Sequence, residues 1–334
     1  MKDIMRIYDE GNLSVRGALD GEKAWILIGD VLYKVNMERA DIERVCSFSG
    51  LLGGGKLWGF NIRVEPDYLL LAMNDRKSVC FVGKDGSLRR VIGEKTSERK
   101  EYFVQFMDND SCLFISMAGA ELFVLRTDGG IEQKKHFTID LMRELSARKL
   151  HFKNIRYYGT AVNKNELIVD VRNSERDLFF IYDKNELKPK RVIDPVKING
   201  TISDFLYDTD YIWFYNRRDD NWIVKYDIGN KCAKTEIKLP NGFGKRVILR
   251  KMDNKILAMS IKGNMGIIGI ESGEIETICN GIYFPLDVAL EKHNTMLCSN
   301  GRDIVVYEYD GKKISLSNRI PIKSDLAVFM DSIS

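Results

Sequence analysis

The sequence predicts an all-β fold built from a repeated unit, because apolar runs of strand length recur at a nearly fixed spacing. Successive runs begin 41 to 54 residues apart, and all intervals but one lie between 41 and 45 residues. Each run is followed, after a short polar stretch, by a second apolar run and a turn rich in Asp, Asn or Gly. A fixed period of this length is the mark of a repeat architecture. The first runs begin at Trp25, Leu69, Leu113, Leu167, Ile212, Ile256 and Leu297.

Each unit is expected to contain four short strands in a meander, which we name a to d in chain order. Strands b and c are the two apolar runs, as in "ELIVDV" and "LFFIY". The turn "DKNEL" follows, and its Asp and Asn side chains suit a tight connection. Strand d is more polar, as in "LKPKRVI", and strand a precedes each first run, as in "SDFLY". The whole chain has only six prolines, which suits repeated pairing because proline removes a ladder donor.

Seven four-stranded units in succession resemble the β-propeller superfamily in the broad sense that includes WD-repeat proteins. The resemblance covers nearly the whole chain and is architectural, since no unit carries the Gly-His and Trp-Asp dipeptides of a WD repeat. It implies one propeller domain, residues 1–334, with seven blades. Six or eight blades, or a two-sheet or two-domain β-structure, are the alternatives. The last blade could be completed by "DIMRIYD" at the start of the chain or by "KKISLSNRI" after Gly311.

One stretch, 136–152, has a helical pattern and accounts for the irregular interval of 54 residues. Thr138 can cap a helix, Asp140 suits its N-terminal end, and Arg148 and Lys149 suit its C-terminal end. Apolar residues recur between them at every third position. We therefore expect one short helix inserted between blades 3 and 4, which either covers the gap between the blades or binds a partner.

The resemblance also divides the connections between two faces. In propellers the a-to-b and c-to-d turns lie on one face, here called the a–b face, and the b-to-c and d-to-a connections lie on the other, here called the b–c face. Acidic residues dominate the turns assigned to the a–b face, whereas the b–c face is mildly basic. The predicted helix belongs to the b–c face.

Candidate binding residues lie in the b–c face. The b-to-c tips such as "NDRK" and "NRRDDN" place Arg beside Asn and Asp, so several arginines could together recognise carboxylates or phosphates, although the same residues also suit solvated turns. The loop 49–59 has three consecutive glycines without the spacing of a phosphate-binding motif, which favours a connector. The candidate residues are Trp58, Arg76, Arg143, Arg148, Lys149, Arg176, Arg217, Arg218 and Arg302.

No motif predicts catalysis, a metal site or a cofactor. The three histidines, His136, His151 and His293, form no metal-binding pattern, and no nucleophile turn of the G-x-S-x-G type is present. The adjacent acids Asp219 and Asp220 are better explained by a surface loop than by acid-base chemistry. The six cysteines lack close pairing, so free thiols are expected.

Composition narrows the class of partner. A formal charge of +3, from 51 basic and 48 acidic residues, gives no support for binding nucleic acid. No apolar run approaches the roughly 20 residues of a membrane span, and the first residues lack a secretory pattern, so we expect a cytoplasmic protein without membrane contact.

These observations favour a non-enzymatic binding or scaffold protein. It would present the helix-bearing, mildly basic face to a protein or peptide partner. The alternative is a propeller enzyme or a small-ligand binder, for a carbohydrate or an anionic metabolite, with its site at the mouth of the central channel.

Overall fold

The computed structural model describes 28 strands, and the described part of the chain falls into seven four-stranded antiparallel sheets. Within every sheet the strands pair with their sequence neighbours, so each sheet is a meander. The described residues are 15–21, 23–28, 31–39, 41–48, 60–73, 78–93, 102–108, 111–116, 119–125, 131–136, 143, 146–147, 156–172, 177–194, 202–208, 210–216, 221–244, 247–260, 262–280, 284–287, 295–299 and 303–321.

The chain divides into two compact units. Unit 1 consists of Met1–Arg99, Gly263–Met265 and Thr277–Ser334, and it contains three of the sheets. Their strands are β1 (Val15–Asp20), β2 (Lys23–Ile28), β3 (Val31–Asn36), β4 (Asp41–Ser47), β5 (Phe60–Val64), β6 (Tyr68–Met73), β7 (Ser78–Gly83), β8 (Leu88–Gly93), β25 (Phe284–Asp287), β26 (Thr295–Ser299), β27 (Asp303–Tyr309) and β28 (Ile314–Pro321).

Unit 2 consists of Lys100–Lys262 and Gly266–Glu276, and it contains three complete sheets and most of a fourth. The strands are β9 (Tyr102–Asp108), β10 (Ser111–Ser116), β11 (Gly119–Leu125), β12 (Ile131–His136), β13 (Arg156–Val162), β14 (Glu166–Arg172), β15 (Asp177–Asp183), β16 (Pro189–Ile193), β17 (Ile202–Asp208), β18 (Tyr211–Asn216), β19 (Trp222–Asp227), β20 (Cys232–Lys238), β21 (Val247–Met252), β22 (Lys255–Ser260), β23 (Asn264–Gly269) and β24 (Ile275–Asn280).

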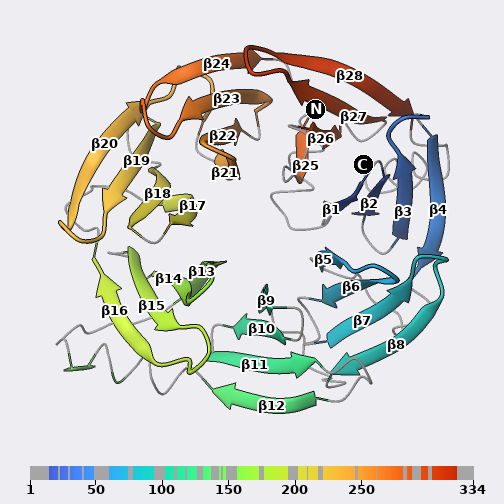
Figure 1. The fold of residues 1–334 in the computed structure, drawn as a ribbon, viewed down its shortest axis with the longest axis horizontal. Coiled ribbons are helices and arrows are strands. Elements are labelled where there is room, and N and C mark those ends of the chain that lie inside the picture. The colour runs from blue at the N-terminus through green and yellow to red at the C-terminus, as the bar shows by residue number, and fades with distance from the viewer. Residues whose placement is uncertain are drawn as a thin grey trace. The chain divides into compact units, whose positions relative to one another are not determined.

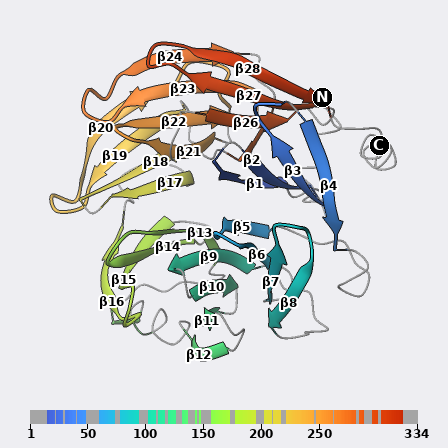
Figure 2. The same ribbon diagram turned by 45° about the vertical axis from the view of Figure 1, so that its right-hand side comes forward.

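Neighbouring sheets within a unit pack by their faces. The first strands lie next to one another, β25, β1 and β5 in unit 1 and β9, β13, β17 and β21 in unit 2, and the fourth strand of each sheet lies farthest from them (Figure 1). Figure 2 shows β17 to β20 side by side in chain order. The predicted all-β propeller fold is therefore confirmed at the level of its repeating unit.

Burial explains why the two middle strands of each four-stranded sheet are continuously apolar in sequence. In the β17–β20 sheet, β18 is buried at every position after its first, whereas most residues of β20 are exposed. The middle strands of this sheet have a neighbouring sheet on both faces, so both sets of alternating side chains lose contact with water. The fourth strand has an open edge, which permits its polar composition.

Apolar clusters join adjacent sheets. One lies between the β13–β16 and β17–β20 sheets, where the ring centroids of Phe179 and Phe205 are 5.0 Å apart. Another lies between the β17–β20 and β21–β24 sheets and includes Trp213 and Ile256. Each fully buried side chain of this size contributes about 1.5–3 kcal/mol, so these interfaces provide much of the stabilisation.

Aspartates fix the c-to-d turns. The Asp183 carboxylate accepts the backbone N–H groups of Asn185 (3.0 Å) and Glu186 (2.9 Å). The Asp310 carboxylate likewise accepts those of Lys312 (2.8 Å) and Lys313 (2.9 Å). These backbone hydrogen bonds lower the pKa of both carboxyl groups. The Asp-rich turn signature in the sequence therefore has a local physical cause.

The last sheet bears on how the predicted ring would close. Strand β28 occupies the fourth place of the last sheet, so the segment after Gly311 completes it, and the start of the chain, "DIMRIYD", lies outside the described residues. The last sheet also contacts the first, because Asn318 Nδ2 donates to the Met37 carbonyl at 3.0 Å. A closed seven-bladed ring depends on how the two units are placed, so it stays a prediction, as does the single domain.

The helix predicted at 136–152 lies mostly outside the described residues, and its first residue, His136, is instead the last residue of β12. Arg143, Ser146 and Ala147 have helical backbone and are exposed. The described part of the chain contains no complete helix, so the extent of the predicted helix and its place between blades also stay predictions.

Candidate functional site

The sequence-predicted binding residues are nearly all outside the described part of the chain. Only Arg143 is described, and it is helical and exposed. Joint recognition of a carboxylate or phosphate by the arginines of the b-to-c tips therefore stays a prediction. The residues outside the described ranges are Trp58, Arg76, Arg148, Lys149, Arg176, Arg217, Arg218 and Arg302.

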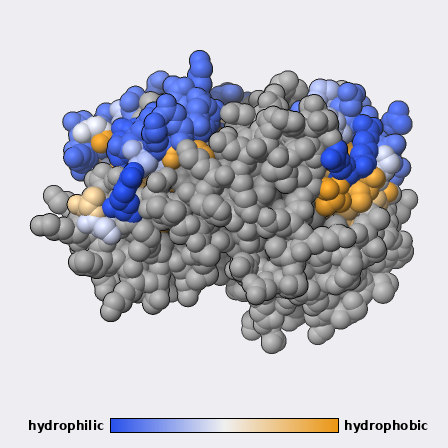
Figure 3. All heavy atoms as spheres, turned by 90° about the horizontal axis from the view of Figure 1, so that it is seen from below, coloured by the Kyte–Doolittle hydropathy of each residue, from blue (hydrophilic) through white to orange (hydrophobic). Residues whose placement is uncertain are grey.

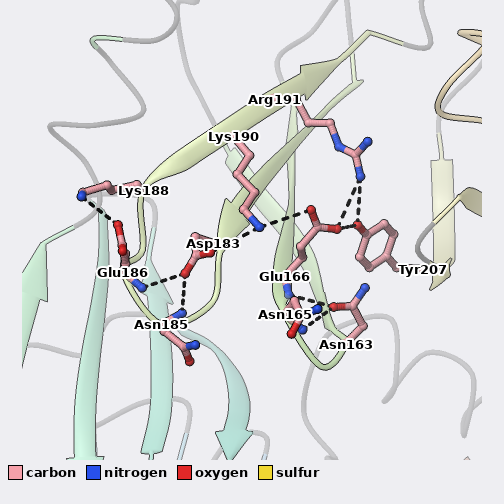
Figure 4. Close-up of polar contacts among 10 residues, drawn as sticks. All are labelled: Asn163, Asn165, Glu166, Asp183, Asn185, Glu186, Lys188, Lys190, Arg191 and Tyr207. Carbon is pink, nitrogen blue, oxygen red and sulfur yellow. Dashed lines mark hydrogen bonds and ion pairs between the residues drawn. The ribbon is translucent and has the colours of Figure 1, made fainter.

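The described residues contain a dense polar network that the sequence analysis missed. It joins the β13–β16 sheet to the β17–β20 sheet, and Figure 4 shows its side chains converging on one carboxylate. We call it the Glu166 network, which consists of Glu166, Asp183, Lys190, Arg191 and Tyr207.

Glu166 is at the centre of this network, with its side chain only 12% exposed. Its Oε2 accepts hydrogen bonds from the Tyr207 hydroxyl and from Arg191 Nη2, the latter at 3.4 Å. Its Oε1 lies 3.6 Å from Lys190 Nζ, which also contacts Asp183 Oδ2 at 3.3 Å. Both oxygens of the carboxylate are therefore occupied.

The local turn positions Glu166 at the first residue of β14. The Asn163 side-chain oxygen accepts the backbone N–H groups of Asn165 (2.9 Å) and Glu166 (2.7 Å). The Asn163 backbone N–H also donates to the Glu166 carbonyl at 3.0 Å, so side chain and backbone together fix the start of the strand. Tyr207 comes from the next sheet, 41 residues away in sequence, which is close to one repeat.

Tyr207 is held in its neutral form. Burial raises the pKa of its hydroxyl, and the hydrogen bond to Glu166 raises it further. Tyr207 donates its hydrogen to a carboxylate that also contacts Lys190 and Arg191, so neither oxygen of Glu166 is left without a partner. The network therefore joins the two sheets.

A second polar arrangement lies on the other side of the β17–β20 sheet. Lys225 Nζ is 4.2 Å from the ring centroid of Tyr211 and 5.1 Å from that of Trp213. Lys234 Nζ donates to the Tyr211 hydroxyl at 3.1 Å. We call these residues the Tyr211 lysine pair. No Asp or Glu within the described ranges forms an ion pair with either lysine.

Inner strands of unit 2 are also linked by charge. A register shift in β17 between Ile202 and Phe205 turns Asp204 toward β21. Its Oδ2 accepts the Leu249 backbone N–H at 2.9 Å and lies 3.3 Å from Arg250 Nη1. These bonds join two sheets and leave the carboxylate well satisfied.

Metal and thiol chemistry find no support within the described ranges. They hold no group of three or more His, Cys, Asp or Glu side chains that could bind a metal ion. Burial raises the pKa of Cys46 to about 11 and of Cys80 to about 12, so these thiols stay protonated near neutral pH. The expected free thiols are confirmed at Cys46, Cys80, Cys112, Cys232 and Cys279.

The described surface is mainly hydrophilic. Exposed large apolar side chains are Val91, Ile278 and Leu316, each on the fourth strand of a different sheet. In Figure 3 hydrophilic residues likewise cover most of the described surface in view, with apolar residues in small areas. Among the described residues, no helix is long and apolar enough to cross a membrane.

Comparisons with known proteins identify the fold. Neither a protein-family model nor a curated protein sequence matches this chain. Solved structures do match over most of its length. The computationally designed protein Ika8 has a TM-score of 0.58 at 9% identity, covering 92% of this chain and 87% of Ika8.

Two natural proteins give similar values. Hsv2 of Kluyveromyces marxianus has a TM-score of 0.58 at 9% identity and covers 94% of this chain and 99% of its own. The WD40 domain of Neurospora crassa Pan2 has a TM-score of 0.56 at 11% identity and covers 90% and 87%. The chain has the β-propeller fold. Because the identities are so low, this likeness shows the fold alone and assigns no activity.

Proposed function

We propose that this β-propeller is a non-enzymatic binding or scaffold protein that engages a protein or peptide partner through its helix-bearing, mildly basic b–c face. The observation that carries the proposal is the exposed helical backbone at Arg143, Ser146 and Ala147. These residues lie in 137–155, the longest connection between consecutive strands. A long connection on a rigid β-scaffold is a common place for a recognition element.

The polar chemistry of the described residues supports binding over catalysis. In the Glu166 network both oxygens of the central carboxylate have partners. The surface of the described ranges carries few exposed large apolar side chains. A partner held by such a surface would be recognised mainly through charge and hydrogen bonds, and its affinity would fall as salt is added.

The proposal includes the architecture and location predicted from the sequence. It takes residues 1–334 as one seven-bladed domain in the cytoplasm, with the tips around Arg76, Arg176, Arg217 and Arg302 on the same face as the helix. The proposed ring is supported by the contact between the last sheet and the first, both of which belong to unit 1.

Charge reversal on the helical segment tests the proposal. Arg143, Arg148 and Lys149 are changed together to Glu, and partners captured from native cell extract are quantified by mass spectrometry. The matched control changes Lys164, Lys231 and Lys312 to Glu, three exposed lysines in turns of the opposite, a–b face.

We expect the helix variant to capture about tenfold less of at least one partner, since unfavourable charge at an interface costs several kcal/mol, and the control to capture amounts close to wild type. Both variants are checked for unchanged melting temperature. Equal capture by all three proteins would refute the assignment of the b–c face.

A further inference from the structure

Four side chains gather on the face of the β17–β20 sheet that packs toward the β21–β24 sheet. Tyr211 and Trp213 lie on β18 and Lys225 on β19, directly opposite Trp213. Lys234 is the unpaired residue of a β-bulge in β20, because Lys225 pairs with Thr235 and the next residue of β19 pairs with Ala233. A bulge re-aims the side chain that it inserts, and Lys234 consequently reaches the Tyr211 hydroxyl.

The two ammonium groups share one aromatic ring and have no ion-pair partner within the described ranges. Lys225 Nζ is 4.2 Å and Lys234 Nζ 5.1 Å from the Tyr211 centroid, so they are no farther apart than the sum of these distances. The nearest acid along the strand is Asp227. Its two carboxylate oxygens accept hydrogen bonds from the backbone and side-chain nitrogens of Asn230, at 2.8 and 3.0 Å. It influences Lys234 only at longer range.

Some lysines of the described ranges do have a carboxylate partner. Five of them form an ion pair with a carboxylate at 3.3 Å or less: Lys84, Lys188, Lys190, Lys251 and Lys255. Lys225 is half-buried, as Lys84 and Lys255 are, yet it forms no ion pair in those ranges, and a charge removed from water is costly when unpaired.

The hydroxyl of Tyr211 completes a set of three donors. It accepts a hydrogen bond from Lys234 Nζ, so its own hydrogen is left to be donated. Two ammonium groups and one hydroxyl hydrogen around the same ring form an environment that attracts a negatively charged oxygen. The aromatic faces of Tyr211 and Trp213 hold Lys225 in place by cation–π attraction.

We propose that Lys225, Lys234 and Tyr211 form an oxyanion-binding site that takes a carboxylate side chain from an acidic segment of a partner protein. Each ammonium group donates as a point charge to a single oxygen, so the two oxygens of one carboxylate match the two ammonium groups. Tyr211 is the first residue of β18, next to an a-to-b turn, so the site is near the a–b face and is separate from the partner surface proposed above.

Isothermal titration calorimetry with the full chain tests this site, using N-acetylated, C-amidated tetraglutamate as the probe. We expect Lys225→Met and Lys234→Met each to weaken binding about tenfold, because a hydrogen bond to a charged group is lost. Tyr211→Phe, which keeps the ring and every charge, should weaken it about threefold.

Lys238→Met is the matched control. Lys238 also lies on β20 and above an aromatic ring, 5.7 Å from the centroid of Trp222, and its loss changes the net charge by the same amount. The affinity of the Lys238→Met variant for tetraglutamate should stay within about twofold of wild type. An equal loss in Lys238→Met would show general attraction to a basic surface and would overturn the site.

Two further outcomes decide the chemistry. Absence of tetraglutamate binding by the wild type, with Lys225-dependent binding of inorganic phosphate, would overturn the carboxylate as ligand. If Lys225→Met does not fold, Tyr211→Phe carries the test, and an unchanged affinity in that variant would overturn the proposal.

Discussion

The Glu166 network and the Tyr211 lysine pair lie on opposite faces of the same β17–β20 sheet, and they differ in charge balance. In the network, Lys190 and Arg191 contact a carboxylate whose two oxygens are both occupied. In the lysine pair, two ammonium groups contact an aromatic ring and form no ion pair within the described ranges. The Glu166 carboxylate, with partners at both oxygens, joins two sheets. The ammonium groups of Lys225 and Lys234, which form no ion pair in those ranges, are available to a ligand.

Removing the central carboxylate of the network should have the largest effect. Glu166→Gln leaves Arg191 and Tyr207 without the charge that they share, and we expect the free energy of unfolding to fall by about 2–3 kcal/mol. Urea denaturation measures the change. Glu186→Gln is the control, because Glu186 and Lys188 are 62% and 73% exposed and an ion pair screened by water contributes little to stability. Equal losses in both variants would contradict the special role of Glu166.

Loss of the Tyr207 hydroxyl should cost less and should depend on pH. Tyr207→Phe removes one donor to Glu166 and is expected to cost about 1–2 kcal/mol at pH 8. Because the pKa of Tyr207 is raised in the folded protein, the unfolded chain releases this proton first as the pH rises. The stabilisation is therefore complete below the usual tyrosine pKa of about 10 and decreases above it.

The comparison of wild type with Tyr207→Phe in urea at pH 8 and pH 11 checks this sign. The difference in unfolding free energy should be smaller at pH 11. A difference that grows with pH would show that the hydroxyl is not held neutral by its surroundings.

The smallest expected effect separates the two kinds of lysine. Lys190→Met breaks contacts with Glu166 and Asp183, but Lys190 is 40% exposed, so we expect a loss of only about 1 kcal/mol. Lys225→Met removes a favourable cation–π contact, but it also removes the unfavourable burial of a charge that has no ion-pair partner in the described ranges. These effects oppose each other, so the free energy of unfolding should change by no more than about 0.5 kcal/mol. Thermal or urea unfolding of both variants measures the contrast, and a larger loss in Lys225→Met would mean that Lys225 is structural.

The repeat and the strands were predictable from the sequence because they depend on local patterns. The apolar run at Leu167 lies in β14 and the run "LFFIY" lies in β15. The turn that follows is fixed by Asp183, whose backbone bonds are local as well. The binding residues were chosen from loops for which no local pattern determines position, and nearly all of them are outside the described residues.

Neither polar arrangement could be found by a motif search. Glu166 and Tyr207 are 41 residues apart and look ordinary alone, although a separation near one repeat is the signal that would relate them. Lys234 lies in a strand whose alternation would direct it away from its neighbours, and only the bulge in β20 brings it to Tyr211.

The sequence by itself determined the all-β class, the period of the units, the order of strands within each and the aspartate turns between them. It did so because strand patterning and turn chemistry depend on neighbouring residues. The tertiary structure alone decided which charges meet, through sheet packing, strand register and one inserted residue in β20. Because of this packing, Lys190 contacts Glu166 and helps to link two sheets. Lys225 instead contacts the Tyr211 ring and has no carboxylate partner among the described residues.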